Sequence, residues 1–310
     1  MFHRGAWLHS FEKFNEKNEV IERPDYTRSI SVAVSDQDFK PTNVKGHISH
    51  LHWSKTGDIW ASNDRGNVGL IDHSGNGKRL IKTCPTYSGH FALATIDNEE
   101  HIYWVHNEEK NIGTDSKDEP VAQTGDWEPI SIFYSTNEQM FYVGKVMQND
   151  AKITRYNNYM VKKNDIHYIR KHGKCGEKIN FRYPAYLVTN INGDLCVSDY
   201  HECVIVVGND KKIRFTYTGS GQRGFSPYGI CTDSRGHILI VDSSSKCIHI
   251  LTEEGTCNQT INISDNFRFP RGLCIDNNGH CFVGTYGSIV VYNYLSNDRS
   301  VTLGTAESDK

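Results

Sequence analysis

The clearest structural unit in this chain reads Pro227-Tyr-Gly-Ile-Cys-Thr-Asp-Ser-Arg-Gly-His-Ile-Leu-Ile-Val-Asp242, and Cys247-Ile-His-Ile-Leu251 follows it. It begins with a short apolar run, turns at Gly236, and continues through a second, β-branched run to an acidic residue. Short runs rich in Val and Ile and bounded by Gly, Asn and Asp are typical of β-strands. Glycine allows the positive φ that tight hairpin turns need. The stretch therefore predicts three consecutive strands, and the more polar run at 256–261 predicts a fourth.

The same unit recurs at a fixed interval along the second half of the chain. Three groups of positions keep a spacing of 43 residues: Pro184, Pro227 and Pro270; Gly193, Gly236 and Gly279; Asp199, Asp242 and Thr285. The fourth runs of these units are expected at 213–217, 256–261 and 300–303. A period of roughly 40–45 residues with four strands per unit is typical of a β-propeller, in which each unit is one blade.

The pattern extends towards the N-terminus with looser spacing. Gly57-Asp-Ile-Trp-Ala-Ser-Asn63 matches Gly193-Asp-Leu-Cys-Val-Ser-Asp199 almost residue for residue. Second strands are expected near Ile59, Ile102, Met140, Leu195, Ile238 and Cys281. The sequence thus predicts an all-β fold, a six-bladed β-propeller of four-stranded blades, with an exposed loop around 170–178. Two separate β-sandwiches are the alternative, but sandwiches need no repeated period.

The repeat also predicts how the chain is divided. We expect a propeller over 29–305, preceded by an N-terminal extension (1–28) and followed by a tail (306–310). Within the extension, 6–22 is expected to form a short helix that ends before Pro24, because the residue before a proline avoids helix. Ring closure usually borrows a strand from the other terminus. The run Ser29-Ile-Ser-Val-Ala-Val34 is therefore expected to pair into the last blade.

Composition excludes several classes of partner. The net charge is -3 and the pI is about 6.6, so no basic field is available to attract nucleic acid, and no DNA partner is expected. The sequence shows no apolar run long enough for a membrane span and no apolar signal segment at its start. Nine cysteines without a Cys-x-x-Cys pair favour reduced thiols and a cytoplasmic location.

The repeated unit resembles the NHL repeat, which runs Pro-x-Gly-Ile-x-x-Asp, then Gly-x-Ile-x-Val-x-Asp, then an apolar run. The residues at 227–233, 237–242 and 247–251 fit this pattern closely, and the match is strong over 181–292 and weaker over 47–160. The segments 23–32 and 124–132 are similar to the C-terminal part of invertebrate tripartite-motif NHL proteins. The resemblance implies a propeller that recognises a ubiquitination substrate or RNA.

In that family, a RING domain carries ubiquitin transfer, and B-boxes and a coiled coil follow it. Residues 1–46 of this chain contain no cysteine, whereas a RING or B-box needs clustered Cys and His zinc ligands. The resemblance therefore covers a propeller without the RING, the B-boxes and most of the coiled coil. We expect this chain not to catalyse the ligase reaction.

Catalytic propellers usually place their site on the innermost strands, around the central channel. Alignment on the repeated glycine gives two rings of such positions: His50, Leu93, Ser131, Tyr186, Gly229 and Gly272, and His52, Thr95, Phe133, Val188, Cys231 and Cys274. Neither ring contains a carboxylate, and a catalytic metal needs about three convergent ligands. We therefore expect no catalytic residue, no cofactor and no metal. His50 and His52 share a strand face and are the best metal candidates, although a packed histidine pair is the simpler interpretation.

The repeated Asp199 and Asp242 invite a catalytic interpretation, but they are better explained by structure. A short acidic side chain at the end of a strand can accept backbone hydrogen bonds and fix a turn. A residue that recurs once per blade is what such a role predicts.

Basic and aromatic residues precede the first strand of three blades. The segments are Phe181-Arg-Tyr-Pro184, Gln222-Arg-Gly-Phe-Ser-Pro227 and Phe267-Arg-Phe-Pro-Arg271. Equivalent loops open on one face of a propeller, where Arg170, Lys171, Lys174 and Lys178 are also expected. Arginine suits carboxylate or phosphate partners, and aromatic rings can stack on bases. The simpler interpretation is that the aromatic rings fill the blade junctions while the arginines lie along the surface.

The expected partner-binding residues are Arg182, Arg223, Arg268, Arg271, Tyr183 and Tyr228. The sequence favours a non-catalytic binding module that recognises a protein partner through one loop face, with RNA as the second candidate partner. The alternative is a six-bladed propeller hydrolase or lyase with a metal in its central channel.

Overall fold

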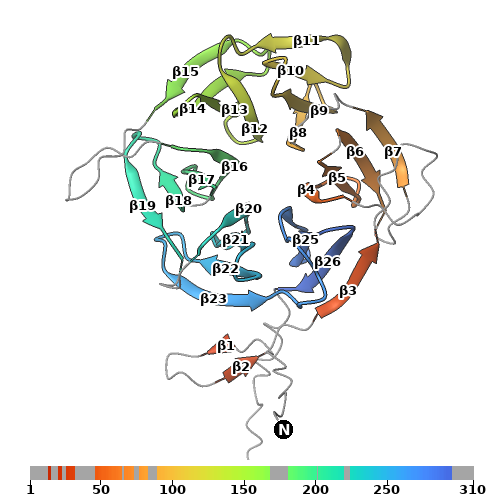
Figure 1. The fold of residues 1–310 in the computed structure, drawn as a ribbon, viewed down its shortest axis with the longest axis vertical. Coiled ribbons are helices and arrows are strands. Elements are labelled where there is room, and N and C mark those ends of the chain that lie inside the picture. Colours follow the sequence, from red (N-terminus) through yellow and green to blue (C-terminus); the bar gives the residue numbers. More distant parts are fainter. Residues whose placement is uncertain are drawn as a thin grey trace, which may run out of the picture.

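The structure is a computed structural model in which six four-stranded antiparallel sheets form a ring (Figure 1). It describes residues 46–294 apart from 65, 73–76, 83–88, 168–180, 201 and 220–223, together with the strands at 13–14, 20–22 and 26–31. This confirms the predicted six-bladed β-propeller. None of the described residues belongs to a helix long and apolar enough to cross a membrane.

Each blade runs from an innermost strand at the channel to an outermost strand at the rim. Blades 1 to 3 consist of β4 (Ile48–Trp53), β5 (Ile59–Asn63), β6 (Asn67–Ile71) and β7 (Gly77–Lys82); β8 (Phe91–Ile96), β9 (Glu99–His106), β10 (Asn111–Thr114) and β11 (Lys117–Gln123); β12 (Glu128–Ser135), β13 (Met140–Met147), β14 (Asp150–Asn157) and β15 (Lys162–Ile166). Blades 4 to 6 consist of β16 (Pro184–Thr189), β17 (Leu195–Asp199), β18 (Cys203–Val207) and β19 (Ile213–Tyr217); β20 (Pro227–Thr232), β21 (Ile238–Asp242), β22 (Cys247–Leu251) and β23 (Cys257–Asn262); β24 (Leu273–Ile275), β25 (His280–Gly284), β26 (Ser288–Asn293) and β3 (Tyr26–Ser31). All six predicted second strands are confirmed.

The ring closes through the N-terminal strand, as the sequence predicts. Strand β3 pairs antiparallel with β26, with Ile30 opposite Ile289, and so provides the fourth strand of blade 6 (Figure 1). The strand begins at Tyr26, earlier than expected. Because β3 fills this place, the run at 300–303 is not the fourth strand of the blade, and it lies outside the described residues together with the expected loop around 170–178.

The helix expected over 6–22 is wrong where the structure describes this segment. Strands β1 (Lys13–Phe14) and β2 (Val20–Glu22) pair with each other in a separate two-stranded sheet. The β-branched residues Val20 and Ile21 favour a strand over a helix, which outweighs the weak helical spacing of the aromatic residues before them. The remaining residues of the extension lie outside the described part of the chain.

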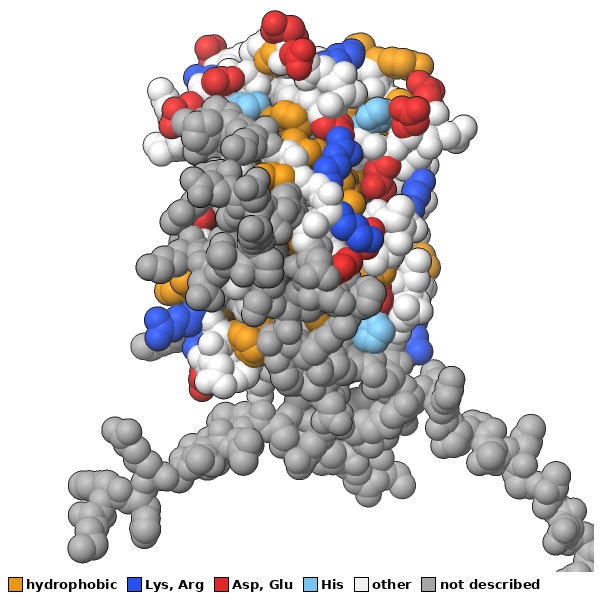
Figure 2. Space-filling model, turned by 90° about the vertical axis from the view of Figure 1, so that its right-hand side faces the viewer, with side chains coloured by type: hydrophobic (Ala, Val, Ile, Leu, Met, Phe, Trp, Pro, Cys, Tyr) orange, Lys and Arg blue, Asp and Glu red, His pale blue; other side chains and the backbone are white. Residues whose placement is uncertain are grey.

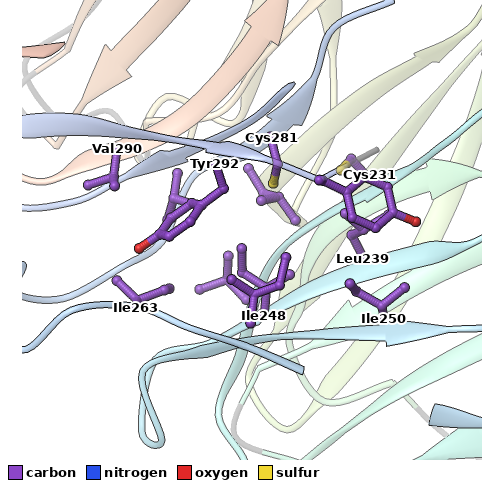
Figure 3. Packing of buried hydrophobic residues seen from close by; sticks show 13 residues of the cluster. Cys231, Leu239, Ile248, Ile250, Ile263, Cys281, Val290 and Tyr292 are labelled. Carbon is purple, nitrogen blue, oxygen red and sulfur yellow. The ribbon is translucent and has the colours of Figure 1, made fainter. Parts of the chain in front are cut away.

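Apolar clusters fill the junctions between neighbouring blades. The junction of blades 5 and 6 brings Ile248 and Ile250 of β22 against Val290 and Tyr292 of β26 (Figure 3). Five further clusters occupy the other junctions, including that between blade 6 and blade 1. Each fully buried Val, Leu or Ile contributes about 1.5–3 kcal/mol, and a blade buries both of its faces only when it has two neighbours.

The turns between first and second strands show why the repeated glycines are needed. In three blades, Oδ1 of Asn190, Asp233 or Asp276 accepts two backbone N–H groups from the turn that follows. The glycine that ends each turn has positive φ, for example +89° at Gly236. These side-chain hydrogen bonds add to the backbone hydrogen bonds of the turn, and together they fix the hairpin in one conformation.

Candidate functional site

A cavity of about 180 Å³ lies at one end of the central channel, where the innermost strands begin. All six blades contribute to its wall, and the polar and aromatic groups that line it are His90, Tyr183, Tyr186, Tyr200, Tyr228 and Arg271. Because strands alternate in direction, the segments before the innermost strands and the turns between second and third strands share one face of the ring. We call this the loop face, and the cavity opens on it.

Arg271 brings a positive charge to the cavity. Its guanidinium lies 5.3 Å from the ring centroid of Tyr228. Its backbone is fixed on both sides, since its N–H donates to Gly284 O and its carbonyl accepts from Gly229 N–H, both at 2.8 Å. The ion pairs found among the described residues include none at Arg271. An arginine remains charged at any ordinary pH, so this charge is available to an incoming anion.

Four tyrosines line the cavity together with this arginine. The hydroxyl of Tyr228 donates to that of Tyr200 at 2.8 Å, and the two rings meet edge to face with centroids 4.8 Å apart. Burial, together with the hydrogen bond to Tyr200, raises the pKa of Tyr228, although Arg271 opposes this shift. Burial likewise raises the pKa of Tyr186 and Tyr183. These phenols therefore stay protonated and uncharged at neutral pH.

Tyr186 crosses the channel. It belongs to blade 4, and its hydroxyl donates to Ser49 O of blade 1 at 2.7 Å. Its ring also meets His90 of blade 2, with centroids 4.5 Å apart. This side chain links three blades and forms part of the cavity wall.

The two histidines beside the cavity carry no charge at neutral pH. Burial lowers the pKa of His90 to about 3, and Arg271 adds to this effect. Burial also lowers the pKa of His50, well below its usual range, with the nearby His90 contributing. The ring of His50 lies 5.3 Å from that of His90, and its Nδ1 accepts the backbone N–H of Phe91 at 3.2 Å. Imidazoles of such low basicity are weak general bases at neutral pH.

The structure brings three of the six expected partner-binding residues together. Tyr183, Tyr228 and Arg271 line the cavity. Arg182 points elsewhere, because its guanidinium bonds Glu202 at 2.7 Å and is 62% exposed. Arg268 is exposed. Arg223 lies outside the described residues, as do Arg170, Lys171, Lys174 and Lys178.

His90 and Tyr200 belong to the site although no sequence pattern points to them, and of the first aligned ring of facing positions only Tyr186 lines the cavity. The cavity wall uses Ser49, Ala185, Tyr228 and Arg271, each one residue before a position in the first aligned ring. Register shifts at the starts of β4, β12, β16 and β20 explain the difference. A bulge interrupts the strict alternation of side chains and so changes which residue faces the channel.

Asp199 and Asp242 make the backbone hydrogen bonds that the sequence predicts. The Asp199 carboxylate accepts the N–H groups of Arg182 and Tyr183, the shortest contact being 2.5 Å. Asp242 accepts that of Ser226 at 3.0 Å. Both aspartates hold the loop that leads into the innermost strand of their own blade, and Asp199 thereby positions Tyr183 in the cavity wall.

The histidine pair proposed for a metal is engaged differently. His52 Nδ1 lies 2.9 Å from Trp53 O, while His50 accepts from Phe91. Within the part of the chain that the structure describes, three convergent metal-ligating side chains are found elsewhere, at Asp242, Cys247 and His249.

Exposed aromatic rings adjoin the cavity on the loop face. Phe269 and Tyr286 are 55% and 43% exposed, and the His47 ring lies 5.2 Å from each. Figure 2 shows acidic and basic side chains interspersed over the described residues on one side of the ring.

Comparisons with known proteins identify the fold. No family model matches the chain, and no curated protein matches its sequence. Among solved structures, a streptogramin B lyase has a TM-score of 0.57 at 16% identity, with 78% of each chain covered. A catalytically inactive His-to-Ala variant of virginiamycin B lyase from Staphylococcus aureus, with quinupristin, has a TM-score of 0.57 at 12% identity, over 86% of this chain and 97% of that one. A candidate gluconolactonase has a TM-score of 0.59 at 10% identity, and the match covers 81% of this chain and 89% of that one. At such low identity these similarities show the propeller fold alone.

Proposed function

We propose that this protein is a non-catalytic binding module that recognises a protein partner through the loop face, with an acidic group of the partner held by Arg271 in the cavity. The observation that carries the proposal is the charge of Arg271, which faces a cavity of tyrosine hydroxyls and has no ion-pair partner among the described residues. A guanidinium among neutral side chains suits a carboxylate.

The size of the cavity favours a side chain of a partner over a free small molecule. Pockets for drug-sized ligands usually enclose about 300–1,000 Å³. The cavity of about 180 Å³ is smaller and suits one acidic side chain or a chain terminus. The exposed rings of Phe269 and Tyr286 next to it provide apolar area for the rest of a protein partner.

The chemistry of the cavity supports binding over catalysis. Tyr186 and Tyr228 are protonated and His90 is uncharged at neutral pH. No Asp or Glu side chain lines the described wall. The NHL-like repeat supports the further proposal that the partner is a ubiquitination substrate, as in tripartite-motif NHL proteins.

A crosslinking pulldown with and without RNase tests this function. We expect Arg271→Glu to abolish recovery of the partner, because it places a negative charge where the acidic group binds. Arg182→Glu is the matched control, since Arg182 lies in an equivalent loop but bonds Glu202 outside the cavity. Equal recovery with both variants would refute the proposal. Recovery that disappears after RNase would show that RNA is the partner.

The enzymatic alternative rests on the solved neighbours, which include a lyase. It requires a metal or a basic group in the channel beside His50 and His90. A His90→Asn variant that lost turnover of a small ester or lactone shown by the wild-type protein would favour the hydrolase or lyase.

A further inference from the structure

A second group of chemically active side chains lies in blade 5, outside the cavity. Asp242 ends β21, Cys247 begins β22, and His249 follows two residues later. His249 Nε2 lies 3.2 Å from Cys247 Sγ and 3.6 Å from Asp242 Oδ2. All three residues are buried, and their ligand atoms lie within 4.8 Å of one another. The function proposed above uses none of them.

The backbone explains why these atoms converge. Asp242 and Cys247 are directly opposite each other in the β21–β22 pair. Cys247 and His249 are two residues apart on β22, so their side chains share a face. Ile248 and Ile250 take the other face and pack against blade 6 (Figure 3). Cys247 and His249 are therefore turned towards blade 4, where Tyr217 of β19 meets His249.

The separations match a tetrahedral zinc centre. Zinc binds imidazole nitrogen, thiolate sulfur and carboxylate oxygen at about 2.0–2.3 Å, which places neighbouring ligand atoms about 3.3–3.7 Å apart. The observed 3.2 Å and 3.6 Å lie at or near this range, and the third separation, between Asp242 and Cys247, is within 4.8 Å. The Ser245 hydroxyl contacts Asp242 Oδ2 and lies 2.9 Å from Cys247 Sγ, close enough to complete the set of donors.

The outer atoms of two of these ligands already have partners. His249 Nδ1 lies 2.8 Å from the Tyr217 hydroxyl, which leaves Nε2 directed at Cys247. Asp242 Oδ1 accepts the N–H groups of Ser226 and Ser244 at 3.0 Å, which leaves Oδ2 for the centre of the cluster. Metal-binding histidines and carboxylates are usually oriented by outer contacts of this kind.

We propose that Asp242, Cys247 and His249 form a structural zinc site, with the Ser245 hydroxyl or a water as the fourth ligand. Thiolate and imidazole ligands in a buried tetrahedral arrangement select zinc over magnesium or calcium. On binding, the Cys247 thiol releases its proton to solvent, and the metal accepts electron pairs from the resulting thiolate and from the neutral His249 ring. The site fastens the β21–β22 turn and, through Ser226, the loop that leads to Tyr228 in the cavity.

Metal analysis of the full, tag-free chain tests the site. We expect one zinc per chain, and after cobalt exchange a thiolate-to-cobalt charge-transfer band. Cys247→Ser should remove the band and lower zinc affinity by at least about 100-fold, since a ligand matters more than the outer contacts that tune a site by 10–100-fold. Cys257→Ser is the matched control, because its Sγ lies 4.0 Å from Nδ1, the other ring nitrogen of His249. Cys257→Ser should retain both the charge-transfer band and the zinc affinity of the wild type.

Zinc-dependent stability of the wild-type protein provides a second readout, in case Cys247→Ser does not fold. Saturating zinc should raise the Tm of the chelator-treated wild type, and Asp242→Asn should reduce this rise. The proposal would be overturned if the wild type did not bind zinc, or if Cys257→Ser lost as much zinc affinity as Cys247→Ser. The cluster would then be a hydrogen-bonded histidine without a metal. Because these measurements need no partner, they stand apart from the test of Arg271.

Discussion

At the scale of the residue, the cavity combines one fixed cation with neutral groups. Arg271 lies beside His90 and Tyr228, and the three influence one another through burial and charge. The histidine is kept neutral because both burial and the guanidinium disfavour a second positive charge. The tyrosines are kept protonated because burial disfavours their anions. The positive charge of the cavity therefore comes from Arg271 alone among the residues that line it.

His90 gives the native state a defined dependence on pH. Its pKa falls from 6.5 to about 3 on folding, so between these values the unfolded chain binds a proton that the native state does not. Stability is therefore complete above about pH 6.5 and decreases as the pH falls, by about 1.4 kcal/mol per pH unit. At pH 5 the loss from this group is about 2 kcal/mol.

Urea unfolding of wild type and His90→Asn at pH 7.5, 6 and 5 measures this effect. The wild type should lose about 2 kcal/mol more than the variant between pH 7.5 and 5, because asparagine does not titrate. Both proteins contain the same carboxylates, so the contribution of these groups to the pH dependence cancels in the difference between the two proteins. Parallel pH profiles would show that the pKa of His90 is the same in the native and unfolded states.

At the scale of the element, the innermost strands approach one another closely. Gly229 N–H of β20 bonds Arg271 O, just before β24, at 2.8 Å, and Gly272 N–H bonds Ile48 O of blade 1 at 3.2 Å. A Cβ on Gly229 would lie only 2.8 Å from Leu273 N. Glycine is thus required here by close approach of backbones, which fixes the position of Arg271 relative to Tyr228.

Gly229→Ala should force β20 and β24 apart. We expect a loss of about 1–3 kcal/mol in the free energy of unfolding, as is usual for overpacking, together with weaker partner binding because Arg271 moves. Gly125→Ala is the control, since a Cβ there meets nothing within 4 Å and carries only the strain of φ +69°. Denaturant unfolding and the pulldown provide the two measurements. Normal binding by Gly229→Ala would show that the strands adjust without moving the guanidinium.

The elements also show what can be predicted from the sequence. The blades could be predicted because proline, glycine and aspartate recur where the fold needs a strand start, a positive φ and a backbone acceptor, as at Pro227, Gly236 and Asp242. The residues that face the cavity could not be predicted in the same way, because bulges at the strand starts shift the alternation of side chains by one residue. Tyr183, Tyr228 and Arg271 were found from their loops. His90 and Tyr200 carry no repeated signal.

The zinc cluster shows a second limit. Its ligands have the spacing Asp-x4-Cys-x-His, which matches no familiar zinc motif, and they converge only because a short turn places Asp242 opposite Cys247. In the same way, the extension has aromatic residues at helical spacing, yet its described residues form strands. Short segments without a repeat leave local propensity as the main guide, and propensity is easily outweighed.

At the scale of the whole molecule, the ring depends on every junction. Clusters of buried apolar residues join each blade to the next, and that between blades 6 and 1 includes Ile289 and Val291 of β26. Strand β3 covers the edge of β26 and joins the N-terminal part of the chain to the last blade. The similar lyase and candidate gluconolactonase show that one ring can support unrelated chemistry, so function must be sought in the side chains at the cavity.

Removal of residues 1–36 should therefore open the ring. Without β3, the edge of β26 is exposed to water and to other chains, which favours aggregation. We expect a loss of several kcal/mol and a fall in Tm on the order of 10 °C or more. A chain that lacks only residues 1–24 is the matched control, because it keeps β3 and loses β1 and β2, which pair only with each other among the described strands. Calorimetry of both chains decides the matter: equal Tm values would mean that β3 contributes nothing to closure, whereas a fall confined to the longer deletion would show that the ring is held shut by its first strand.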